Sequence, residues 1–247
     1  LNPERVMEHM DGEFKGPFWE IFYKDWDTQV QGELTLKHDT LSKVEAEAEK
    51  ALQSFNMKNG TKISNKSAGK KFTVNGSTWT VSEMVGIWAS TLNQDQLEGL
   101  MYGHNMLDYE SHIREFEKIP EFLALRAAAE VYMDSLESLW PGLFEAHAEL
   151  KNEVLKKSPG RYWPRYVKNK SYGTLEQQAI NELGHATGVM RGSFQDGFTK
   201  SRIKVSPMHR KPQDLDFFKV VNRHIEAVSR YAVSYTHLRA HETEADL

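Results

Sequence analysis

The sequence contains no cysteine, which removes several kinds of chemistry at the outset. Without a thiol there is no disulfide framework, no thiolate nucleophile and no thiolate ligand for zinc or an iron–sulfur cluster. The sequence also lacks a secretory apolar segment and any apolar run near the ~18 residues of a membrane span, so we expect no membrane partner. What is present, 247 residues of which 39% are apolar, is enough for one domain, or one and a half, with a sizeable core.

The small net charge of −4 hides a separation of charge along the chain. Residues 1–150 carry 14 Lys and Arg against 25 Asp and Glu, whereas residues 151–232 carry 16 against 7. One interpretation is two oppositely charged surfaces that attract each other or a neighbouring domain. The other is a C-terminal part that faces phosphates, because clustered cations release counterions from nucleic acid. The size of the surplus favours the first interpretation and leaves the second open.

Apolar spacing predicts an all-α fold, an irregular multi-helix bundle. Near-heptad spacing predicts one long helix, or two in line, over about residues 17–55. A second long helix should begin at Pro120, and Pro141 should kink or split it. The last predicted helix runs from Leu215 to Ala232, with acidic residues matched to the dipole of its first turn.

Short-range signals predict the starts of the smaller elements. Thr80 with Glu83, and Asn93 with Gln96, form capping-box patterns that begin two helices, and Asp108 begins another. The exception to the helical pattern is a small β-hairpin near residues 72–79, where Asn75-Gly76 stands between two β-prone arms.

We expect three parts along the chain. Residues 1–158 form a helical domain with a flexible loop over residues 56–71, which is polar and carries five lysines. Residues 159–232 form a basic, loop-rich part that packs on this domain. Residues 233–247 are expected to be a non-native read-through tail, because residues 233–243 are similar to a translated transposon-end sequencing adapter.

One cluster combines aromatic rings with cations, as surfaces that bind single-stranded nucleic acid do. A second basic run lies further along the chain. The alternative is an aromatic loop that plugs the edge of the core while its cations extend outward, and the many apolar side chains of the segment favour it. The residues predicted to contact DNA or RNA are Arg161, Trp163, Arg165, Lys168, Lys170, Lys200 and Arg202.

No combination of nucleophile, base and orienting group is recognisable, so we predict no catalytic residues, no cofactor and no metal. Glu182 and His185 have the Glu-x-x-His spacing of di-iron helices, but no second such motif exists. A metal-dependent hydrolase built on this pair is the alternative function. We interpret His104 as a structural cap joining two helices, and His147 as a hydrogen-bonded core histidine.

Several motifs, taken in order over residues 5–232, resemble a family of helical domains from phage and mobile-element polyvalent proteins, the large polyvalent protein-associated domains. The resemblance lies in Met10-Asp-Gly12 with Gly16-Pro-Phe18, Trp79 to Trp88, Leu100 to Asn105, Arg161 to Arg165, Phe198 to Arg202, and Asp216-Phe-Phe218.

This resemblance implies a non-catalytic structural or interaction module within a very long phage-encoded protein. Such proteins join helicase, methylase, protease or polymerase modules and enter the host together with the DNA. The partners would be other domains of the same long chain, and the location would be the virion, the host cytoplasm or both. The family supplies no catalytic residues to carry over.

Overall fold

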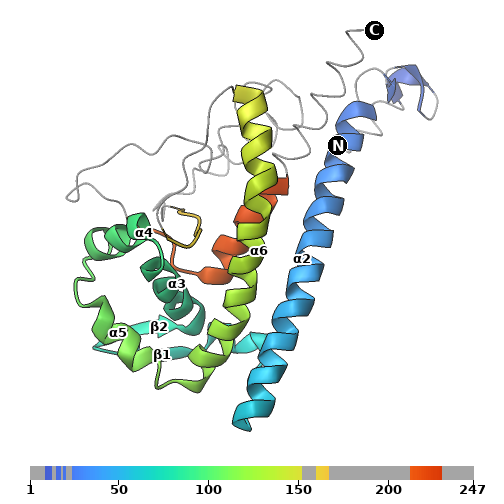
Figure 1. Cartoon of the computed structure of the whole chain (residues 1–247). Coiled ribbons are helices and arrows are strands. Elements are labelled where there is room, and N and C mark those ends of the chain that lie inside the picture. Colours follow the sequence, from blue (N-terminus) through green and yellow to red (C-terminus); the bar gives the residue numbers. More distant parts are fainter. Residues whose placement is uncertain are drawn as a thin grey trace. The chain divides into compact units, whose positions relative to one another are not determined.

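The computed structural model describes residues 9–12, 15–17, 19–20, 24–151, 160–166 and 212–229 (Figure 1). The chain divides into two compact units. The smaller unit comprises residues 1–39, 173–194 and 226–247, and the larger comprises residues 40–172 and 195–225. Residues 160–166 and 212–225 fall in the same unit as residues 40–151.

The described fold is helical apart from one two-stranded antiparallel hairpin, which confirms the all-α prediction. A further helix spans residues 217–229. The other elements, in chain order, are α2 (Lys24–Asn59), the 3-10 helix η2 (Asn65–Gly69), β1 (Lys71–Val74), β2 (Ser77–Thr80), α3 (Val81–Thr91), α4 (Gln94–Glu98), the π-helix η3 (Gly99–Gly103), α5 (Tyr109–Phe116) and α6 (Pro120–Lys151).

The long first helix is confirmed, but it ends later than its apolar spacing predicts. α2 continues to Asn59 and stops at Gly60, whose φ of +65° is the left-handed conformation that commonly ends helices. The expected loop over residues 56–71 is therefore shorter, and η2 lies inside it. In the smaller unit, Lys37 of α2 pairs with Glu226 at 3.2 Å.

The hairpin and the helix after it form as their local sequence predicts. Asn75 and Gly76 have φ values of +49° and +76°, as a type I′ turn requires at both central positions. The register pairs Phe72 with Trp79 and Val74 with Ser77. Directly after β2, the capping box predicted at the start of α3 is present in full.

The core of the larger unit forms around α3. Helix α3 contacts α4, α5, α6, β2 and η2, and it is shielded from solvent along most of its length. Of the two outcomes expected at Pro141, a kink or a split, the split is excluded because α6 continues through this residue as one helix. Proline removes one backbone donor from the helix, and α6 is helical on both sides of it. The largest fully buried side chains of this core include Met84, Ile87, Leu100, Phe116, Phe122, Leu125, Met133, Trp163, Phe217 and Ile225.

Candidate functional site

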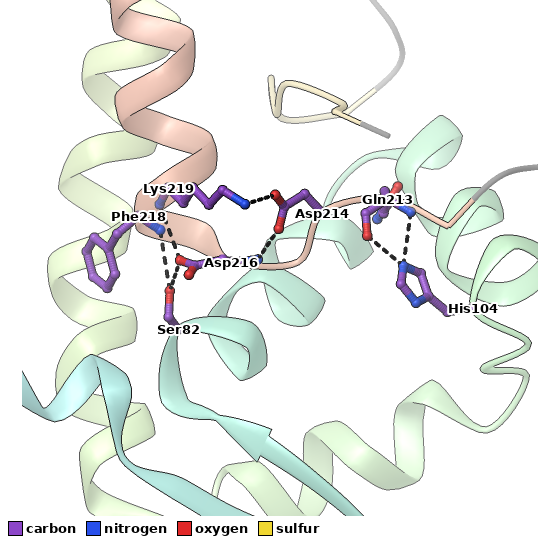
Figure 2. A network of polar contacts seen from close by, with 7 residues as sticks. All are labelled: Ser82, His104, Gln213, Asp214, Asp216, Phe218 and Lys219. Carbon is purple, nitrogen blue, oxygen red and sulfur yellow. Dashed lines mark hydrogen bonds and ion pairs between the residues drawn. The ribbon is translucent and has the colours of Figure 1, made fainter. Parts of the chain in front are cut away.

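A network of polar contacts joins α3 and His104, the residue after η3, to residues 213–219 (Figure 2). We call it the polar latch, and it consists of Ser82, Ser90, His104, Gln213, Asp214, Asp216 and Lys219. Its two halves are far apart in sequence but lie in the same compact unit.

The cap of the latch begins the helix at residues 217–229. The Ser82 hydroxyl donates to Asp216 Oδ1 at 2.6 Å and accepts from the backbone amide of Phe218 at 3.4 Å. The same Asp216 oxygen accepts from the backbone amide of Lys219 at 3.2 Å, which is the bond of an N-cap carboxylate. Asp214 accepts from the backbone amide of Asp216 and pairs with the Lys219 ammonium at 2.8 Å. The Ser82 side chain of α3 thus helps to cap a helix that begins more than 130 residues later in the sequence.

The buried end of the latch holds both the main chain and the side chain of Gln213. His104 Nε2 lies 3.0 Å from the Gln213 amide nitrogen and 2.8 Å from its carbonyl oxygen. Gln213 Nε2 donates to the Ser90 hydroxyl at 2.8 Å, and this hydroxyl donates to the carbonyl oxygen of Gly86. Ser90 and Gln213 are both nearly inaccessible to solvent. His104 is the C-cap of η3, and its ring also contacts a residue 109 positions away, which the sequence did not indicate.

Gly86 allows the segment at residues 212–216 to lie directly on α3. A Cβ atom at this position would lie 1.8 Å from the carbonyl oxygen of Leu215, which is far inside van der Waals contact. Glycine inside a helix is unfavourable by propensity alone, so its presence here has a packing reason. Gly99 of η3 is similar, with a Cβ position 2.6 Å from Gln213 Oε1.

A second set of contacts fixes residues 160–166 to the start of α4. The side-chain oxygen Oδ1 of Asn93 caps α4. Its Nδ2 donates to the backbone carbonyl oxygen of Arg161 at 3.1 Å. Gln96 Nε2 donates to the carbonyl oxygen of Trp163 at 3.1 Å. The predicted Asn93 cap is thus confirmed, but Gln96 binds the remote segment instead of completing the box. Gly160, with φ +98°, pairs with Asn93 in an isolated bridge.

Aromatic rings hold residues 160–166 against the helix at residues 217–229. Trp163 stacks on Phe217 with ring centroids 4.7 Å apart and planes 9° apart. His224 Nε2 lies 2.9 Å from the Tyr162 hydroxyl, and Nδ1 lies 3.4 Å from the Tyr166 hydroxyl. Burial lowers the pKa of His224 to about 3, so the ring is neutral in the folded protein at pH 7.

The structure describes three of the seven residues predicted to contact nucleic acid, and none of the three is placed as a free nucleic-acid contact. Arg161 pairs with Asp134 of α6, and Trp163 is 2% exposed, so its ring offers no face to a base. The Arg165 guanidinium carbon lies 3.7 Å from the Cβ position of Gly99, against the core. The other four, Lys168, Lys170, Lys200 and Arg202, lie outside the described residues.

The residues of the metal hypothesis, and the side chain of the predicted core histidine, lie outside the described part of the chain. Glu182 and His185 are not among the described residues, and the side chain of His147 is not described either. Within the described ranges, no group of three His, Asp or Glu residues could hold a metal ion. In the same ranges, no helix is both long enough and apolar enough to span a membrane.

Sequence reasoning missed Ser82, Ser90 and Gln213 as members of the latch. None of them has a motif of its own, because each finds its partner through the tertiary fold. Gly86 is the residue whose signal could have been used, since a glycine within a strong helical pattern indicates a close approach. No protein-family model, curated protein or solved structure matches the chain.

Proposed function

We propose that this chain is a non-catalytic structural and interaction module of a phage-encoded polyvalent protein. The observation that carries the structural part is how the described chain uses three of its polar side chains. Gln96, Ser82 and His104 each bind the backbone of a segment more than 60 residues away. A polar group of a catalytic site is directed at a substrate, whereas these groups hold the chain to itself.

The phage part of the proposal comes from the ordered sequence motifs, of which three contain latch residues. Trp79 to Trp88 contains Ser82. Leu100 to Asn105 contains His104, and Asp216-Phe-Phe218 contains the helix cap and the ring that stacks on Trp163. These motifs hold the fold together, which is the use expected of motifs in a module without catalysis. Its partners would be other domains of one long chain, in the virion or the host cytoplasm.

Sequencing the genomic DNA on both sides of the coding region tests this proposal. We expect an open reading frame that continues into helicase, methylase, protease or polymerase modules. A short gene for a stand-alone metabolic enzyme would overturn it.

The finer part of the proposal is weak, sequence-independent binding of single-stranded nucleic acid by the basic part of the chain. Because Trp163 is buried and Arg161 is paired, Lys168, Lys170, Lys200 and Arg202 carry this part. Each phosphate contact adds about 0.7 to the log–log dependence of affinity on salt for single strands. Replacing all four by Ala should therefore flatten the slope by up to about 3.

The matched control replaces four exposed lysines outside this part of the chain, Lys58, Lys62, Lys66 and Lys71, by Ala. Affinity for an oligo-deoxythymidine is measured over a range of salt concentrations for both variants. Equal slopes in the two variants, or no binding by the wild type, would contradict the nucleic-acid proposal and leave the structural one intact.

A further inference from the structure

Two Asn-Gly pairs occur in the described chain, at Asn59-Gly60 and Asn75-Gly76, and the structure holds them very differently. Asn-Gly is the dipeptide most open to deamidation, because glycine has no side chain to shield its amide. In this reaction the glycine nitrogen attacks the Asn Cγ, and ammonia leaves as a five-membered succinimide closes. Water then opens the ring to Asp or to isoaspartate. The attack requires the Asn backbone and side chain to rotate together.

The first pair is fixed on both sides. Asn59 is the last residue of α2, and its Nδ2 donates to the carbonyl oxygen of Phe55 at 2.8 Å. The chain after Gly60 is fastened by Asn56, whose Oδ1 accepts from the Thr61 hydroxyl at 2.8 Å and from a backbone amide at 3.1 Å. The Thr61 amide also donates to the Asn56 carbonyl oxygen. Rotation at Asn59 therefore breaks several bonds at once.

The second pair is at the tip of the hairpin. Asn75 and Gly76 are both exposed, and nothing lies within 4 Å of a Cβ position at Gly76. Both statements hold for Asn59 and Gly60 as well, so the two pairs differ in their hydrogen bonds. The Asn75 side chain has one long contact, from Nδ2 to the Ser111 hydroxyl at 3.3 Å. A two-residue tip opens at little cost in free energy, because the paired strands below it stay intact.

We propose that Asn75 is a site of spontaneous covalent modification, at which deamidation converts the hairpin tip to aspartate or isoaspartate. The second product carries the main chain through Cβ and so lengthens the turn by one carbon atom. A type I′ turn has two central residues with fixed geometry, so the extra atom disrupts the Val74–Ser77 pairing. Either product adds one negative charge to this tip.

The test ages the intact protein at mildly alkaline pH and follows both sites by peptide mass mapping. A parallel sample is aged in denaturing urea. In the folded protein we expect Asn75 to convert several-fold faster than Asn59, and in urea we expect the two rates to converge. Asn59 thus serves as a control with the same dipeptide in the same molecule.

Two results would overturn the proposal. One is equal or slower conversion at Asn75 than at Asn59 in the folded protein. The other is the same ratio of rates in urea, because the difference would then come from neighbouring residues and not from the fold. An Asn75→Asp variant, which has the charge without the longer turn, separates the two products: only isoaspartate should lower the melting temperature below that of this variant.

Discussion

The imidazole of His224 couples the stability of the larger unit to pH. Its pKa is about 3 in the folded protein, whereas an unfolded histidine titrates near 6.5. Between these values the unfolded chain binds the proton and the folded chain does not. The stabilisation is therefore complete above about pH 6.5 and falls, by about 1.4 kcal/mol per pH unit, as the pH drops toward 3.

We expect urea unfolding measured from pH 7 to pH 5.5 to show this loss in the wild type. A His224→Gln variant should have a flatter dependence, by up to one proton, while His38→Gln, at an exposed position, should match the wild type. The same slope in all three proteins would show that His224 is protonated in the folded state.

A second prediction concerns the contribution of Trp163 to stability, because its ring is buried against Phe217. Trp163→Ala should lower the free energy of unfolding by about 3–5 kcal/mol, through lost burial and the cavity left behind. Tyr102→Ala, at a half-exposed ring, should change it by less than about 0.5 kcal/mol. A Trp163→Ala protein of normal stability that no longer binds single-stranded DNA would instead make Trp163 a stacking residue.

At the scale of elements, the close approach of residues 212–216 to α3 depends on Gly86. Gly86→Ala places a methyl group against the Leu215 carbonyl, and a backbone atom cannot move aside as a side chain can. We expect a loss of about 1–3 kcal/mol, the usual range for overpacking, despite the better helix propensity of alanine. Gly69→Ala is the matched control, since nothing lies within 4 Å of its Cβ position. Chemical denaturation of both variants makes the comparison, and equal stabilities would contradict the observed contact.

The elements that the sequence predicts are those whose signals are local. The hairpin at Asn75-Gly76, the capping box at Thr80 and the start of α6 at Pro120 each depend on residues within a few positions. The continuity of α6 through Pro141 could not be predicted, because a proline inside a helix removes one backbone hydrogen bond and usually kinks or breaks the helix.

The site was less accessible to sequence reasoning than the elements. The sequence indicated acidic residues in the first turn of the last helix, and the structure places Asp216 just before that helix as its cap. Its partner Ser82 has the properties of any serine in a first turn. Gln213 has no motif, and its two partners are 109 and 123 positions away. The aromatic cluster left two interpretations open, and burial of Trp163 on Phe217 supports the core interpretation for that ring.

At the scale of the whole molecule, the latch should make α3 and residues 217–225 open together. Hydrogen exchange followed by mass spectrometry should give both segments similar free energies of opening in the wild type, because each segment loses its buried packing partners when the other one opens. Gly86→Ala should lower both by a similar amount. If residues 217–225 lose protection while α3 keeps it, the two segments are separate folding units and the latch does not couple them.

The 134 positions between Ser82 and Asp216 also have a consequence during synthesis. At roughly 5–20 residues per second, the ribosome needs about 7–27 s to make the chain between them. Throughout that interval α3 lacks the segment at residues 212–216 that covers Gly86. Ser90 and His104 likewise have no Gln213 to bind. The nascent protein therefore carries the Gly86 face of α3 without its cover for many seconds, and this packing step waits until residues 212–216 have been made.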